Sequence, residues 1–173
     1  MEERMDDLML EDLARQAGSL LSEQGLMLAT AESCTGGWLG QTITSIAGSS
    51  AWYERGFITY SIISKHEMLG VSDATLDEYG AVSEQVASEM TAGAIGRSHA
   101  QVAVSITGIA GPDGGTAKKP VGMVCFAWMM KDGLARTETR YFSGNREEIR
   151  RQSVANALQG VIDLLNSIPP EVA

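Results

Sequence analysis

The sequence contains few of the residues that build disulfide or metal sites. Its two cysteines, Cys34 and Cys125, stand far apart without Cys-x-x-Cys spacing, and its only histidines are His66 and His99. A disulfide framework needs more cysteines, and a zinc site needs more closely spaced ligands. We therefore expect neither a disulfide scaffold nor a bound metal.

Long apolar runs and an excess of positive charge are also lacking. No apolar stretch approaches the length that spans a bilayer, and residues 1–13 are too acidic for a targeting peptide. The 13 basic residues are outnumbered by 22 acidic ones, which leaves a formal net charge of −9. Nucleic-acid binding depends on clustered positive charge, so we expect no nucleic-acid partner. Because a membrane-spanning run and a targeting peptide are lacking, we expect no membrane partner and a cytoplasmic protein.

The densest basic stretch covers residues 146–151, where three arginines are mixed with Glu147 and Glu148. One interpretation is a solvated helix face with pairing four residues apart, such as Glu147 with Arg151. The other is a site for a phosphate-sized anion. Both interpretations remain open at this point.

The 173 residues, 44% of them hydrophobic, suit a single domain over residues 1–173 that builds its own core. Apolar spacing and turn residues predict helices over 8–24, 37–46, 64–69, 73–79, 83–99 and from 145 to just before Pro169. They predict strands over 26–31, 55–60, 101–107, 121–130 and 134–142, the last two joined by a hairpin turn at 131–133. This order predicts an α/β fold, a three-layer α/β/α sandwich with a mixed, partly parallel sheet.

Three polar segments follow expected strands. They are TAESCTGG at residues 30–37, YSIISK at 60–65 and SITGIAGPDGG at 105–115. In open α/β sheets, function gathers in the loops beyond the carboxyl ends of the strands. We therefore expect the three segments to meet in one site.

Ser33 stands where a strand gives way to two glycines and a helix, which is a suitable place for a nucleophile. The glycines let a substrate approach the backbone, and the first N–H groups of a helix can stabilise developing negative charge. The same residues are also ordinary turn and capping chemistry. Cys34 is a competing nucleophile, although an isolated cysteine is more often a small core residue.

A serine nucleophile needs a base. Neither histidine has a supporting acid at a suggestive spacing, and no Gly-x-Ser-x-Gly motif is present, so a Ser-His-Asp triad has little support. Lys65 follows a strand, and a lysine desolvated there could lose its proton near neutral pH. A solvent-exposed surface lysine is the alternative.

The loop after Thr107 contains four glycines, Gly108, Gly111, Gly114 and Gly115. Their backbone N–H groups could cradle a phosphate. The spacing matches neither a dinucleotide fingerprint nor a Walker A motif, so a plain connecting loop is the alternative. Asp113 is interpreted as a turn residue rather than a metal ligand.

The runs TAESCTGG, ITGIAGPDGG, KPVG and FSGNREEIR together resemble the CinA C-terminal domain family over about residues 8–168. Members of that family are nicotinamide-nucleotide amidohydrolases. The resemblance implies hydrolysis of the carboxamide of nicotinamide mononucleotide (NMN) to the carboxylate, with release of ammonia, in pyridine-nucleotide salvage. It implies that Ser33 is the nucleophile and Lys65 its base. The substrate-binding residues expected with them are Thr35, Gly36, Tyr60, Thr107, Gly108, Gly111 and Arg146.

The sequence departs from the family pattern beside Lys65. Where the family usually has Tyr-Ser-Asn-Glu-Ala-Lys, Ile62 replaces the amide and Ile63 the carboxylate. A second interpretation is therefore a nucleotide-binding regulatory or assembly module that keeps the fold without the chemistry. Some relatives carry an additional N-terminal domain, and we expect the stand-alone form here. We also expect a small-molecule nucleotide as ligand, no cofactor, and a homo-oligomer.

Overall fold

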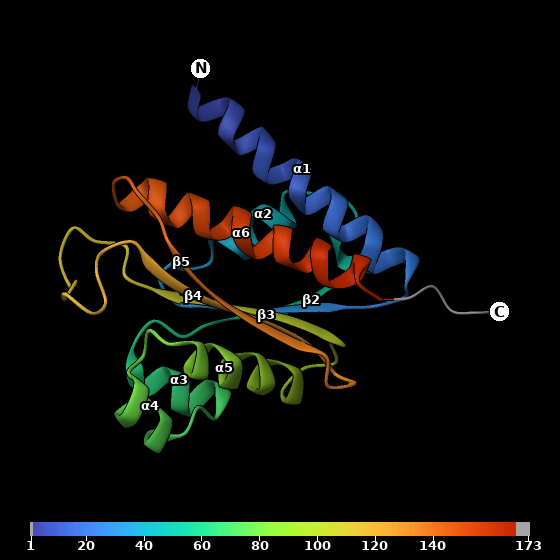
Figure 1. Ribbon diagram of the computed structural model, residues 1–173. Coiled ribbons are helices and arrows are strands. Elements are labelled where there is room, and N and C mark those ends of the chain that lie inside the picture. Colours follow the sequence, from blue (N-terminus) through green and yellow to red (C-terminus); the bar gives the residue numbers. More distant parts are fainter. Residues whose placement is uncertain (1, 169–173) are drawn as a thin grey trace.

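The computed structural model describes residues 2–168, with side chains from Asp6 onward (Figure 1). The helices are α1 (Glu2–Glu23), α2 (Trp38–Thr44), α3 (Ile62–Leu69), α4 (Asp73–Tyr79), α5 (Glu84–Gly96) and α6 (Arg146–Asn166), and a 3₁₀ turn, η1 (Ser49–Ala51), follows α2. The strands are β1 (Leu28–Glu32), β2 (Tyr53–Ile58), β3 (Val102–Gly108), β4 (Met123–Met130) and β5 (Ala135–Tyr141). None of the helices within residues 2–168 has the length and apolar character needed to cross a membrane.

The five strands form one mixed sheet in the order β2-β1-β3-β4-β5. β1 pairs in parallel with β2 and β3, whereas β3 with β4 and β4 with β5 pair antiparallel. All five residues of β1 are buried, as expected for a strand that has a neighbour on each side and a layer over each face. The predicted mixed, partly parallel sheet is confirmed.

Helices cover both faces of the sheet (Figure 1). α1, α2 and α6 lie on one face, and α3, α4 and α5 lie on the other. The larger apolar core, which includes Leu21, Phe126 and Leu158, lies between the sheet and the first group of helices. A second core, which includes Leu69 and Met90, fills the other side. The structure is therefore the predicted three-layer α/β/α sandwich.

Two glycines permit close packing between layers. A Cβ at Gly160 of α6 would lie 2.0 Å from the Trp128 ring, whose Nε1 donates to the Ala157 carbonyl at 2.9 Å. A Cβ at Gly93 of α5 would lie 1.9 Å from the carbonyl oxygen of Leu69, at the end of α3. Because Gly93 has no side chain, α5 packs closely against the end of α3, the helix that carries Lys65.

Several predicted boundaries are confirmed by local geometry. Gly25 follows α1 with φ of 67°, and Gly133 takes φ of 108° in the hairpin turn between β4 and β5. Asn145 caps α6, since its side chain accepts from the backbone N–H of Glu148 at 2.9 Å. α6 ends at Asn166, and the two prolines expected to follow it lie outside the described residues.

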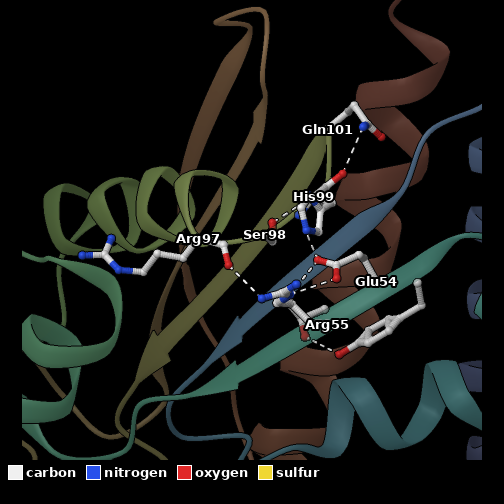
Figure 2. Close-up of polar contacts among 9 residues, drawn as sticks. Glu54, Arg55, Arg97, Ser98, His99 and Gln101 are labelled. Atoms are coloured by element: carbon white, nitrogen blue, oxygen red, sulfur yellow. Dashed lines mark hydrogen bonds and ion pairs between the residues drawn. The ribbon is translucent and has the colours of Figure 1, made fainter.

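Several predicted boundaries differ from the structure, among them the start of α1, at Glu2 rather than residue 8, and the start of α3, at Ile62 rather than residue 64. β2 covers Tyr53–Ile58 rather than 55–60, and α5 ends at Gly96 rather than near His99. Figure 2 shows the contacts made just after the end of α5: Arg55 donates to the Arg97 carbonyl at 3.0 Å, and the backbone N–H of His99 donates to Glu54 at 3.1 Å. These bonds tie the start of β2 to the entry of β3, at the end of the parallel strands opposite to where Ser33 lies.

Candidate active site

The three polar segments meet around one cavity of about 300 Å³ at the carboxyl ends of the parallel strands. Its lining residues come from the loop after β1, the β2–α3 junction, the segment before α5, the loop after β3 and the start of α6: Ser33, Cys34, Tyr60, Ile62, Lys65, Ala81, Val82, Thr107, Gly108, Ile109, Ala110, Gly111, Asp113, Gly114 and Arg146. The volume lies at the lower end of the range for small-molecule sites. The predicted convergence of the three segments is confirmed.

Ser33 and Lys65 are in direct contact at this cavity. Lys65 Nζ lies 2.9 Å from Ser33 Oγ and donates to the Thr59 carbonyl at 2.7 Å. The lysine is 1% exposed, because α3 begins directly after β2 and turns this side chain inward. The alternative of a solvent-exposed surface lysine is therefore wrong.

Burial sets the protonation of both candidate groups beside Ser33. It lowers the pKa of the Lys65 ammonium from 10.5 to about 8, partly opposed by the neighbouring Cys34. It raises the pKa of the Cys34 thiol from 9.0 to about 12, because a buried thiolate loses its solvation. A lysine whose pKa is lowered toward neutral pH can act as a base, and a thiol whose pKa is raised stays protonated. Both shifts favour Ser33 over Cys34 as the nucleophile.

Glu32 supports the turn that carries Ser33. This carboxylate is 2% exposed, and its Oε1 accepts from the Thr35 hydroxyl at 2.7 Å. The same oxygen accepts from the backbone N–H groups of Gly37 at 3.2 Å and Leu39 at 2.9 Å, and Oε2 accepts from that of Gly40 at 3.1 Å. A negative charge at the first turn of α2 also interacts favourably with the positive end of the helix dipole. An acid directly before a glycine-rich helix start is the only sign of this role in the sequence.

Arg150 holds the same turn from the opposite side. Its Nε donates to the Cys34 carbonyl at 3.0 Å and its Nη2 to the Thr35 carbonyl at 3.1 Å. The solvated-face interpretation of residues 146–151 is therefore wrong for Arg150, since α6 packs this face against the loop after β1. For Arg151 only the predicted pairing is confirmed: its guanidinium lies 3.3 Å from the Glu147 carboxylate, but its side chain is only 15% exposed.

Two backbone N–H groups of the described turn lack an acceptor in another residue, and of their two residues only Cys34 lines the cavity. Within the described residues, the N–H groups of Cys34 and Thr35 donate to no other residue. The Ser33 N–H, in contrast, donates to the Ile106 carbonyl at 3.0 Å and anchors the turn to β3. Unused N–H groups directly after a serine can stabilise an oxyanion formed at that serine.

Arg146, Tyr60 and Gly111 form one wall of the cavity. Arg146 donates through Nη1 to the Gly111 carbonyl at 2.7 Å and through Nη2 to the Tyr60 hydroxyl at 3.2 Å. Tyr60 is 63% exposed, so this wall lies at the mouth. The guanidinium is at the first residue of α6, where the helix dipole also favours an anion.

The other expected substrate contacts are divided. Thr107 and Gly108 line the cavity, although the Thr107 hydroxyl donates to the Ala81 carbonyl at 2.8 Å. Thr35 and Gly36 are not among the lining residues, because the Thr35 side chain turns toward Glu32 and is fully buried. The structure therefore brings Thr107 and Gly108, but not Thr35 and Gly36, into the lining of the cavity.

Asp113 and Ile62 are further lining residues. Asp113, expected to be a turn residue only, brings a carboxylate to the cavity. Ile62 is 60% exposed and presents an apolar surface beside Lys65, whereas Ile63, 63% exposed, is not part of the lining. In the part of the chain that the structure describes, no group of three or more His, Cys, Asp or Glu side chains is arranged to hold a metal ion.

Comparison with known proteins identifies the family of this chain. The sequence pattern of the CinA C-terminal domain matches residues 10–165. The chain belongs to this family. This CinA-family chain is 53% identical over 155 residues to "Nicotinamide-nucleotide amidohydrolase PncC" of Escherichia coli K12, an alignment that covers 90% of the chain and 94% of the relative.

Longer relatives and solved structures extend the comparison. A "CinA-like protein" of Akkermansia muciniphila is 46% identical over 149 residues, which are 86% of this CinA-family chain but 36% of the relative. The crystal structure of the competence/damage inducible protein CihA from Agrobacterium tumefaciens matches with a TM-score of 0.88 at 48% identity, covering 90% of this chain and 95% of that one. A structure from Klebsiella pneumoniae reaches 0.89 at 34% identity, covering 92% and 99%.

Proposed function

We propose that this protein hydrolyses the carboxamide of NMN to nicotinate mononucleotide and ammonia through Ser33 and Lys65. The observation that carries the proposal is the buried contact between Lys65 Nζ and Ser33 Oγ, 2.9 Å long, at a cavity of about 300 Å³. The choice of NMN as substrate is supported by relatives named nicotinamide-nucleotide amidohydrolases, at 52–53% identity.

The first half of the reaction forms an ester on Ser33. Neutral Lys65 accepts the hydroxyl proton as Oγ bonds to the carboxamide carbon, and the carbonyl oxygen takes the negative charge. The 2.9 Å separation serves this transfer because a neutral amine can accept at the same distance at which an ammonium donates. The Lys65 ammonium then protonates the amide nitrogen, the C–N bond breaks, and ammonia leaves.

The second half releases the acid. Lys65, neutral again, removes a proton from water as the water oxygen attacks the ester carbon. Collapse of that intermediate returns the proton to Ser33 Oγ and frees the carboxylate. The backbone N–H of Cys34, which lines the cavity directly after Ser33, stabilises the oxyanion in both halves.

The nucleotide phosphate binds at the Arg146 wall. Arg146 provides a full positive charge in an acidic chain, and the glycine-rich loop after Thr107 adds backbone donors. We propose this position because Arg146 bonds the hydroxyl of the exposed Tyr60 at the mouth of the cavity, where the far end of a bound nucleotide would reach.

Ammonia release by purified protein tests this proposal, with NMN, nicotinamide and NAD as substrates. We expect release from NMN, near-complete loss in Ser33→Ala, and retained turnover in the neighbouring control Cys34→Ala. Turnover lost in Cys34→Ala but kept in Ser33→Ala would move the nucleophile to Cys34. Binding of NMN by calorimetry without ammonia release would favour the regulatory or assembly module, and partial rescue by Ile62→Asn would then locate the defect beside Lys65.

A further inference from the structure

Lys119, the lysine of the KPVG run, has no part in the mechanism above, yet its side chain holds one wall of the cavity. Its Nζ donates to the carbonyls of Tyr79 and Val82, the second at 2.8 Å. These carbonyls belong to the link between α4 and α5, residues 79–83, whose Ala81 and Val82 line the cavity. We propose that Lys119 is a positioning residue that holds this α4–α5 link against the nicotinamide ring. The inference rests on the proposed function, because the ring is part of NMN.

Side chains hold all four carbonyls at the start of the α4–α5 link. Among the described residues, no backbone N–H outside the regular helices and strands donates to the carbonyls of residues 79–82. The Ser83 hydroxyl donates to the second of these carbonyls at 2.9 Å, and the Thr107 hydroxyl donates to the third at 2.8 Å. Lys119 donates to the first and the fourth. One ammonium therefore supplies half of the bonds that hold these carbonyls.

The bond from Thr107 shows which end of the cavity the link borders. Thr107 follows Ile106, whose carbonyl accepts from the Ser33 N–H at 3.0 Å. Ala81, bonded to Thr107, therefore lies near Ser33. Arg146, in contrast, lies at the mouth. The carboxamide has to reach Ser33, so the ring that carries it lies beside the link, whose two apolar side chains suit the face of an aromatic ring.

Lys119 reaches the link from a fixed backbone. Its N–H donates to the Thr116 hydroxyl at 3.0 Å, and its carbonyl accepts from the Thr116 N–H at 2.8 Å, which closes a turn at the end of the glycine-rich loop. The ammonium fits closely against the link, since a Cβ at Gly80 would lie 2.9 Å from Nζ. The same loop is held at Gly111, whose carbonyl accepts from Arg146 at 2.7 Å. Lys119 thus joins two walls of the cavity, the glycine-rich loop and the α4–α5 link.

The Lys119 side chain lies outside the cavity that it supports. It is not among the lining residues, but it lines a neighbouring hollow of about 380 Å³, and Val82 borders both. Its removal therefore acts on the substrate only through the link. The contact between Ser33 and Lys65 comes from other elements, so we expect binding to be affected more than the chemical step.

Lys118 provides a matched control in the same loop. It carries the same charge and is exposed, and among the hydrogen bonds and ion pairs of the described residues its side chain makes none. Lys118→Met and Lys119→Met therefore each remove one positive charge and keep an unbranched side chain, but only the second releases the link.

The test compares both variants with the wild type as purified full-length proteins whose fold is checked by circular dichroism. We expect Lys119→Met to raise KM for NMN by about three- to tenfold, the range that one net hydrogen bond spans. KM for nicotinamide riboside should rise equally, because this substrate has the ring but lacks the phosphate. The change in kcat should be smaller than that in KM, and Lys118→Met should match the wild type.

Hydrogen exchange followed by mass spectrometry tests the link itself without any substrate. Peptides that cover residues 79–83 should exchange their amide hydrogens faster in Lys119→Met than in the wild type, because a segment that loses its bonds opens more often. The same peptides should be unchanged in Lys118→Met. Equal exchange in all three proteins would show that Lys119 does not hold the link and would refute the proposal.

Three kinetic outcomes would also overturn it. They are an unchanged KM in folded Lys119→Met, an equal rise in Lys118→Met, and a rise confined to NMN, which would identify a phosphate contact instead of a wall for the ring. If the wild type binds NMN without releasing ammonia, the proposed hydrolysis fails, and dissociation constants from calorimetry replace KM in the same comparison and decide the role of Lys119. A wild type that does not bind NMN refutes both proposals.

Discussion

The buried Lys65 predicts a measurable link between pH, turnover and stability. Its pKa of about 8 in the folded protein means that the neutral, proton-accepting form is about 9% of the population at pH 7 and about 91% at pH 9. We therefore expect kcat/KM on NMN to rise about tenfold between these pH values. A lysine with its ordinary pKa would still be almost wholly protonated at pH 8 and would give no plateau near pH 9.

The same shift acts on stability with a definite sign. The folded-state pKa of Lys65, about 8, lies below the value of 10.5 expected for the unfolded chain. The unfolded chain therefore binds more protons between these two values, and the free energy of unfolding rises with pH across this window. The penalty for burying the charged form, about 3 kcal/mol in full, is complete below pH 8 and is relieved as the pH rises toward 10.5.

Lys65→Met isolates this effect because methionine does not titrate. The difference in unfolding free energy, wild type minus variant, should grow by about 2 kcal/mol between pH 7 and pH 9.5. Constant effects of the substitution, such as the lost bonds to Ser33 and Thr59, cancel in this comparison. Urea titrations followed by tryptophan fluorescence at each pH supply both values, since Trp52 and Trp128 are buried. Parallel stability profiles for the two proteins would refute the lowered pKa.

Three further predictions concern separate parts of the structure. Arg146→Ala should weaken the apparent affinity for NMN by about 1.5–3 kcal/mol and that for nicotinamide riboside much less, as measured by KM; equal losses would reject the phosphate contact. Glu32→Gln should lower the free energy of unfolding by about 1–3 kcal/mol in urea, because a buried carboxylate with four donors is replaced by an amide that can no longer satisfy them all. Gly93→Ala should cost about 1–3 kcal/mol, since its Cβ would meet the Leu69 carbonyl at 1.9 Å, whereas the control Gly96→Ala has open space and should be neutral or stabilising.

The arrangement of the fold could be predicted from the sequence where one local signal decides the structure. Asp73–Tyr79 is a helix within the predicted bounds because Ser72 caps it, and the turn at Gly133 fixes the β4–β5 hairpin. β2 was less predictable. It is an edge strand with half-exposed residues, so its alternation is weak, and its start depends on the partner strand, where the register shifts after Leu28.

The site follows the same division. Ser33, Lys65 and Arg146 belong to recognisable local motifs, and the structure brings them to one cavity. Glu32 and Arg150 could not be identified in this way. The sequence does not distinguish an exposed glutamate from a buried one, and the burial of Glu32 with four donors is visible only in the folded chain. Arg150 contacts the Cys34 carbonyl across a separation of 116 residues.

The change of direction at β3 has a consequence for the order of folding. The antiparallel β4–β5 hairpin joins neighbouring residues, whereas the parallel β1–β3 ladder must close a loop in which Met27 meets Gln101, 74 residues later. Loop closure of this kind is slow and costs chain entropy before any contact forms. The proposed catalytic cavity lies at the ends of the parallel strands, so we expect it to be assembled only when this step is complete. Recovery of amidase activity during refolding therefore reports the arrival of the fully formed sheet, which the helical signal of partly folded chains does not.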